Sequence, residues 1–128
     1  MEKEFVPYEL AVKLKALGFN EPCFGFYLED GTWTPASYSK EGTVYPSNTD
    51  LLPGWYTAPL FQQAFRWIRE KHGLFSSCDI SNFVNKTYGY VINSSNPPYY
   101  LHDVHNLKSI EEAEIACLTK LIEIVENR

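Results

Sequence analysis

The chain has 128 residues with 11 basic and 16 acidic side chains, so its formal net charge is −5. This length supports one hydrophobic core without a disulfide or a metal, and a hydrophobic fraction of 45% excludes a disordered or collagen-like chain. The acidic balance disfavours duplex nucleic acid as a partner, because that affinity comes from many Lys and Arg contacts with phosphates. The charged amino end and the lack of a long apolar run predict a cytoplasmic protein that does not enter membranes.

The first predicted helix spans about Pro7 to Leu17, and Gly18 follows its last turn. Its leucines recur at helical spacing on one face, which indicates packing on an apolar layer. Alternating apolar residues then predict a strand over 23–29. The following Asp30-Gly31 pair predicts a tight hairpin in which both central residues have positive φ, with a return strand at 32–34.

Residues 35–53 are rich in Pro, Ser, Gly, Thr and Asn and predict a loop with one short strand at 43–45. A loop of this length within a compact domain is typical of a functional or mobile segment. We therefore treat 34–56 as a loop-rich segment of one domain that covers residues 1–128.

The second predicted helix begins at Ala58, is capped by the hydroxyl of Thr57 and ends at Gly73. Its apolar stripe at helical spacing comprises Phe61, Ala64, Phe65 and Ile68. Three strands are expected next, at 74–80, 83–92 and 99–104, with a loop at 93–98 by composition.

The last helix begins at a capping box formed by Ser109 and Glu112. In this motif the serine hydroxyl accepts a hydrogen bond from a first-turn amide, and the carboxylate of Glu112 accepts one from the amide of Ser109. Its apolar stripe is wider than that of a half-buried helix. We therefore expect contact on more than one side, either from the first helix or from a second copy of the protein. The stripe comprises Ile110, Ala113, Ile115, Cys117, Leu118, Leu121, Ile122, Ile124 and Val125.

Four segments of the chain are similar in sequence to a known protein family. They span residues 21–25, 63–71, 111–118 and 120–125. Their sequences are EPCFG, QAFRWIREK, EEAEIACL and KLIEIV. They resemble a family of small proteins with no assigned activity, found in gut Bacteroidota and in the phages and mobile elements that infect them. The resemblance covers about half of the chain, namely the first helix and the first strand, the second helix and the last helix. It implies a bacterial or phage cytoplasm as the context. No catalytic or binding residue is carried over from it.

The segment His102-Asp103-Val104-His105 suggests a metal site, but residues three apart on a strand point to opposite faces. We therefore predict no metal site and no cofactor. The three cysteines have no metal-ligand or disulfide spacing and are expected to be unbridged core residues. No nucleophile elbow or phosphate-binding glycine loop occurs, so we predict no catalytic residue. A cysteine enzyme using Cys78 and His72 is the alternative.

The candidate binding residues lie on the second helix and just before it. Gln62, Arg66 and Arg69 share a polar helix face, and the two guanidinium groups are suited to a phosphate or a carboxylate. The alternative is a solvated face. Trp55 and Tyr56 belong to the loop-rich segment, where aromatic side chains provide adaptable contact area. The alternative for them is ordinary packing of the loop onto the domain.

The order of the elements predicts a single α+β domain in which an antiparallel sheet is packed on one face by two or three helices. Two small sheets flanking a helical layer are the alternative. For function we predict a non-enzymatic binding protein, encoded by a phage or mobile element, that acts through a protein interface. It engages either a partner protein or a second copy through the last helix. The alternative is a protein that binds or sequesters a small anionic metabolite or nucleotide, and a hydrolase without a familiar motif ranks third.

Overall fold

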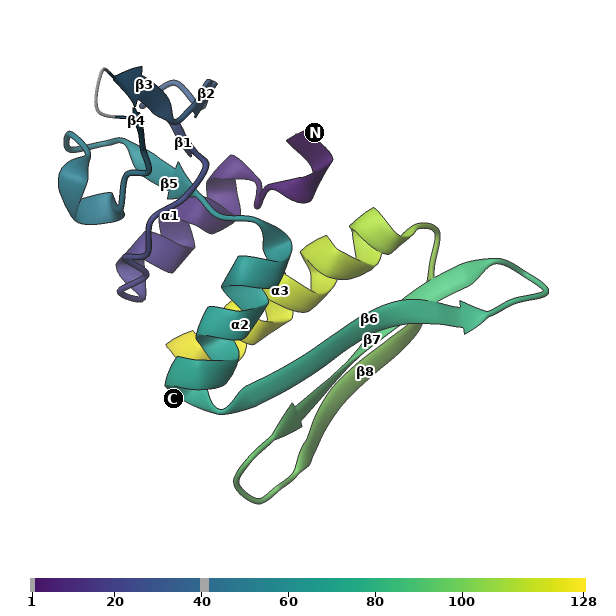
Figure 1. Ribbon diagram of the computed structural model, residues 1–128. Helices are drawn as coiled ribbons and strands as arrows, with labels where there is room; N and C mark the ends of the chain where they lie inside the picture. Colours follow the sequence, from purple (N-terminus) through teal and green to yellow (C-terminus); the bar gives the residue numbers. More distant parts are fainter. Residues whose placement is uncertain (1, 40–41) are drawn as a thin grey trace. The chain divides into compact units, whose positions relative to one another are not determined.

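The computed structural model describes residues 2–39 and 42–128 (Figure 1). It contains helices and antiparallel sheets in the predicted α+β class, which is confirmed. The strands do not join into one sheet. The chain divides into two compact units, Met1–Leu60 and Phe61–Arg128, and each unit has a three-stranded antiparallel sheet of its own.

The first unit contains one α-helix on a small sheet whose strand order is β2-β1-β5, with a separate β3-β4 ribbon. The helix forms as predicted, because its leucines face the core: Leu10 and Leu14 are buried. The elements are η1 (Glu2–Glu4), α1 (Tyr8–Ala16), β1 (Gly25–Tyr27), β2 (Trp33–Pro35), β3 (Ser37–Ser39), β4 (Gly42–Val44), η2 (Asn48–Asp50) and β5 (Tyr56–Ala58).

The predicted β1–β2 hairpin forms, but its turn differs from the prediction. Tyr27 pairs with Trp33, so the connection is longer than two residues. Within the described residues of this turn only Gly31 has positive φ, at 86°. Asp30 instead accepts a hydrogen bond from the amide of Thr32 at 3.0 Å, which holds the turn without a left-handed aspartate.

The buried side chain of Asn48 links the loop-rich segment to other parts of the first unit. Asn48 donates from Nδ2 to the carbonyl of Phe19 at 2.7 Å and accepts at Oδ1 from the amide of Thr57 at 2.9 Å. Both polar groups of this buried side chain are therefore satisfied, and they join the segment to α1's exit loop and to β5.

The predicted start of the second helix at Ala58 is wrong. Tyr56–Ala58 form β5, which pairs with β1, and the helix begins at Phe61. Thr57 is buried in that strand and does not cap the helix. Sheet pairing outweighs the local helix-start pattern here because β5 buries Thr57 and Ala58 in the core of the first unit.

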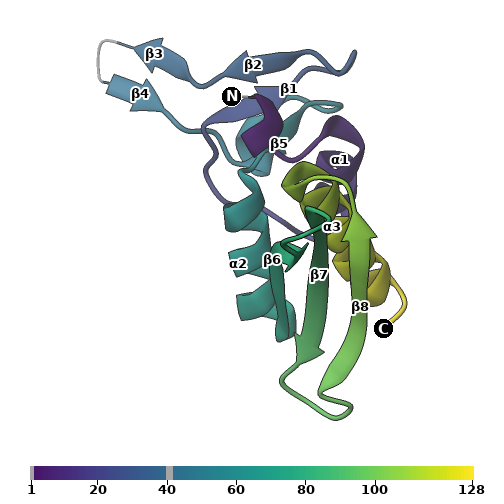
Figure 2. The same ribbon diagram turned by 90° about the vertical axis from the view of Figure 1, so that its right-hand side faces the viewer.

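The second unit contains a sheet of order β6-β7-β8 with α2 and α3 on one face (Figures 1 and 2). α3 contacts all three strands, and α2 contacts β6 and α3. This unit therefore has the predicted arrangement of an antiparallel sheet packed on one face by two helices. Its elements are α2 (Phe61–His72), β6 (Leu74–Asn82), β7 (Thr87–Ser94), β8 (Tyr100–Leu107) and α3 (Ile110–Glu126).

The last helix begins where predicted. Ser109 Oγ accepts from the amide of Glu112 at 3.1 Å, but the Glu112 carboxylate accepts from the amide of Lys108 at 3.0 Å, one residue earlier than in the predicted capping box. Leu118 and Ile122 are buried like the main stripe. Part of the cover on this side comes from α2, whereas the first helix or a second copy was expected to supply it. None of the helices in the described ranges is long and apolar enough to cross a membrane.

Candidate functional site

The sheet of the second unit has one face that no helix of the unit covers, which we call the open face. Along β6, residues facing α3 alternate with exposed ones. Strand pairing places Ser77 opposite Val91, and Val91 opposite Asp103, so these three form one row across the open face. The open face includes Phe75, Ser77, Asp79, Ser81, Gly89, Val91, Asp103 and His105.

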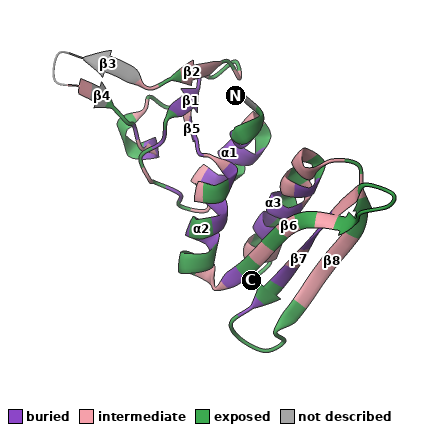
Figure 3. Ribbon diagram, turned by 45° about the vertical axis from the view of Figure 1, so that its right-hand side comes forward, coloured by how far each residue is buried: buried purple, intermediate pink, exposed green. Residues whose placement is uncertain are grey.

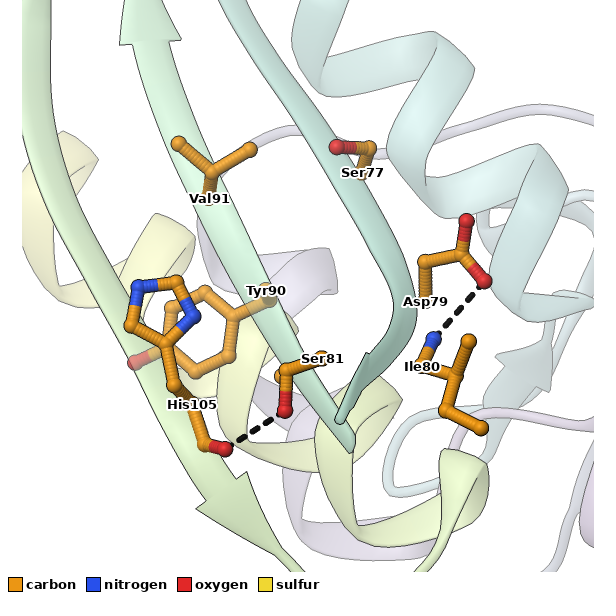
Figure 4. Close-up of a pocket in the computed structure, with 8 residues that line it drawn as sticks. Ser77, Asp79, Ile80, Ser81, Tyr90, Val91 and His105 are labelled. Atoms are coloured by element: carbon orange, nitrogen blue, oxygen red, sulfur yellow. Dashed lines mark hydrogen bonds between the residues drawn. The ribbon is translucent and has the colours of Figure 1, made fainter. Parts of the chain in front are cut away.

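A hollow of about 240 Å³ lies on this face, between β6 and His105 of β8 (Figure 4). Gly89 lies in the middle strand at this point, where the pairing of β7 with β8 is irregular. A β-carbon on Gly89 would collide with the carbonyl oxygen of Val104. The close approach of the two strands therefore requires glycine.

Asp103 is the centre of a hydrogen-bond network on β8. Tyr100 donates its hydroxyl proton to Asp103 Oδ1, and His105 Nε2 pairs with Asp103 Oδ2. The bond from Tyr100, followed by that from His105, lowers the pKa of Asp103 below its ordinary value of 3.8. The same bond raises the pKa of the Tyr100 phenol. Both carboxylate oxygens are thus used within the strand.

This network does not form a catalytic triad. Ser81 Oγ donates to the main-chain oxygen of His105 at 2.5 Å, and Figure 4 shows that the bond ends on the carbonyl rather than on the ring. A serine nucleophile needs a base that takes its proton, and this arrangement supplies none. His102 lies on the opposite face, where its ring packs beside that of Tyr90 with 5.7 Å between the ring centroids. In the described part of the chain, no group of three or more His, Cys, Asp or Glu side chains could hold a metal ion.

The turn between β6 and β7 exposes two apolar side chains that the sequence did not single out. Phe83 is 80% and Val84 is 89% exposed. The turn is ordered, because Asn82 Oδ1 accepts from the amides of Val84 at 2.9 Å and Asn85 at 3.0 Å. Phe83 was expected to begin a strand, but β7 begins at Thr87. The asparagines on either side of the apolar pair were the available signal for a turn. We call Phe83 and Val84 the hairpin tip.

The predicted polar residues of the second helix lie on its exposed side. Gln62, Arg66 and Arg69 are all exposed on α2, whereas Phe65 and Ile68 on its other side are buried. Their spacing therefore produces the polar face that the sequence indicated, in the second unit. The binding of an anion there stays a prediction.

Trp55 and Tyr56 belong to the first unit, where both have packing contacts. The Trp55 ring stacks on Phe26 with 5.6 Å between ring centroids, and Tyr56 meets the edge of Tyr8 at 5.8 Å. Lys15 Nζ lies 4.9 Å from the centre of the Tyr56 ring, a cation–π distance. The alternative of ordinary packing accounts for these contacts without a ligand.

The first unit also has a hollow, of about 560 Å³, beside the end of α1. Lys15 and Asn20 lie in its lining, and Asn20 Oδ1 accepts from the amide of Thr49 at 2.9 Å. Lys15 also donates to the carbonyl of Trp55 at 3.5 Å. The Lys15 side chain thus lines the hollow and also contacts the two predicted aromatic residues, Trp55 and Tyr56.

Comparisons of this chain with protein-family models, with curated proteins and with solved structures find no match.

Proposed function

We propose that this chain is a non-enzymatic binding protein and that the hairpin tip is its contact with a partner protein. The observation that supports the proposal is the exposure of Phe83 and Val84 in a turn fixed by Asn82. Figure 3 colours this turn as exposed, in contrast to the buried residues of β7. Large apolar side chains at adjacent exposed positions are typical of interaction sites.

The energetics support a tip of this kind. Burying a Phe or Val side chain is worth about 1.5–3 kcal/mol each, so the pair offers roughly 3–6 kcal/mol before ordering costs. The two hydrogen bonds from Asn82 already hold the turn. The ordering cost on binding is therefore small, which is the advantage of a preorganised contact.

A protein groove suits this tip better than a lipid surface. Interfacial membrane contacts combine apolar side chains with several basic ones, which attract anionic lipids. The turn has one basic residue, Lys86, and the whole chain has a net charge of −5. Electrostatics therefore oppose binding to an anionic membrane, which supports a protein as the partner of the apolar pair.

A photo-crosslinking residue at position 83 tests the proposal in cells of the organism that encodes the chain. We expect crosslinks to one recurrent protein, and Phe83→Ser with Val84→Ser should weaken its binding by 100-fold or more. Tyr99→Ser is the matched control, because Tyr99 is 64% exposed next to β8, away from the tip. Equal binding by the tip variant and the control would refute the proposal.

The same assay decides between the tip and the arginines of α2. Arg66→Ala with Arg69→Ala removes two exposed cations and should leave the fold intact, because surface substitutions change stability little. If this pair abolishes binding while the tip variant does not, the partner contacts α2. A crosslink to a second copy of the chain would instead indicate self-association, which sedimentation of the purified protein measures independently.

A second candidate function, binding of a small anion, is favoured by Lys15 at the hollow of the first unit. Native mass spectrometry of freshly purified protein should then reveal a retained small molecule. Lys15→Met should remove it, while Lys13→Met, an exposed lysine on the same helix, should not. Spectra without a bound molecule in both the parent and the variants would count against this candidate.

A further inference from the structure

Two of the cysteines face each other in the second unit. Cys78 pairs with Tyr90 across the sheet and lies on the face that α3 covers. Its sulfur is 3.8 Å from the carbonyl oxygen of Ala113 in α3. Cys117 follows Ala113 by one helical turn on the same side of α3, so the packing of α3 on β6 brings the two cysteine side chains close together.

The two thiols differ in access and in acidity. Cys78 is half-buried, whereas Cys117 is fully buried. A hydrogen bond from Cys117 lowers the pKa of Cys78, and the same bond together with burial raises the pKa of Cys117. The negative charge of Glu114 opposes ionisation of both thiols. Cys78 is therefore the sulfur that a small oxidant in solution can reach, and we assign it as the nucleophile.

We propose that Cys78 and Cys117 form a redox-active dithiol, which hydrogen peroxide or a small organic peroxide oxidises to a disulfide between β6 and α3. The inference is independent of the hairpin tip. It rests on the placement of both side chains where α3 packs on β6, on their unequal exposure and on the third cysteine lying in the first unit. Cys23 is buried in the first unit, where its thiol donates to the carbonyl of Glu21 at 3.4 Å.

The chemistry proceeds in two displacements. The Cys78 thiolate attacks one peroxide oxygen, the O–O bond breaks, and the leaving oxygen takes a proton to become water, or an alcohol from an organic peroxide. The sulfur of Cys117 then attacks the sulfenic sulfur of Cys78. The S–S bond forms, the S–O bond breaks, and the departing hydroxide takes the Cys117 proton as a second water. The peroxide gains two electrons, one from each sulfur.

Treatment of the full chain with hydrogen peroxide tests the proposal directly. After denaturation in N-ethylmaleimide, we expect a chain that has lost two hydrogens and carries one maleimide, on Cys23, where the untreated chain carries three. A peptide map should contain the Cys78–Cys117 crosslink. Cys23→Ser is the matched control and should form the same disulfide at an unchanged rate.

Variants of the pair separate the two steps. Cys117→Ala keeps the outer thiol and removes its partner, so a 1,3-diketone trap such as dimedone should label Cys78 after peroxide. Cys78→Ser should abolish both the label and the disulfide. Should Cys117→Ala fail to fold by circular dichroism, the mass and the map of the parent chain decide. Three maleimides after peroxide, or a disulfide that includes Cys23 or joins two chains, would overturn the proposal.

Discussion

Leu121 in α3 offers the sharpest test of how the second unit is held together. Its side chain is 0% exposed, in the middle of the helix that covers all three strands. Leu121→Ala removes three carbons, whose transfer from water is worth about 2 kcal/mol. The cavity left behind adds about 1 kcal/mol or more, because a close-packed core collapses only partly. We expect the free energy of unfolding of this unit to fall by about 3 kcal/mol.

Urea denaturation followed by circular dichroism measures this loss. With a slope of about 1–1.5 kcal/mol per molar urea, the transition midpoint should drop by roughly 2–3 M. Hydrogen exchange of peptides from β7 and α3 assigns the change to the second unit. The more severe change Leu121→Asp buries an unpaired carboxylate and should leave the unit unfolded.

Ile115→Ala is the matched control, because it lies on the same helix and its side chain is 42% exposed. We expect it to cost less than about 1 kcal/mol, since less apolar surface is lost and alanine has the better helix propensity. If Leu121→Ala and Ile115→Ala shift the midpoint equally, α3 is not packed on the sheet as described, and the reasoning fails.

Further predictions concern the sheet, the titrating groups and metal. Gly89→Ala should destabilise the second unit by about 1–3 kcal/mol, because its β-carbon meets the carbonyl of Val104; thermal melting measures the loss. Burial keeps the pKa of His72 below its ordinary value of 6.5, so the unfolded state binds a proton first and stability should fall as the pH drops below about 6.5. Chemical denaturation across pH 8 to 5 should therefore show a slope that His72→Gln lacks. Asp103 has a lowered pKa, so its contribution is present above its ordinary value of 3.8 and is lost as the pH falls through the folded value. Carbon-detected NMR titration should find the pKa of Asp103 below its ordinary value of 3.8, and Tyr100→Phe should move this pKa back toward the ordinary value. Dialysis against a chelator should leave the melting temperature unchanged, and bound zinc in stoichiometric amount would contradict this.

The sequence by itself predicted the elements whose causes are local. The spacing of Leu10 and Leu14 is enough to place α1, and the stripe of Ala113, Cys117 and Leu121 is enough to place α3. The hydroxyl of Ser109 caps α3 because the capping contact lies within one turn of the chain. Exposure of the polar face of α2 followed from periodicity in the same way.

Pairing between distant segments was decided by the tertiary structure. Nothing near Tyr56–Ala58 indicates that this segment completes a sheet with β1, so the local pattern suggested a helix start. The local sequence around Phe83-Val84 is typical of the beginning of a strand. The pairing of β6 with β7 instead places these two residues in the turn between the strands. A period-2 pattern does not reveal which strands pair, and pairing depends on the whole sheet.

The candidate sites depend on the same long-range contacts. Cys78 and Cys117 are far apart in the sequence, and only the packing of α3 on β6 brings their thiols together. The spacing of the cysteines in the sequence gave no indication that these two lie close together. The side chains of Asp103 and His105 share a face because strand residues alternate, which the sequence does imply once β8 is placed. The chain alone thus determines which side chains lie on a face, and the tertiary structure determines which faces meet.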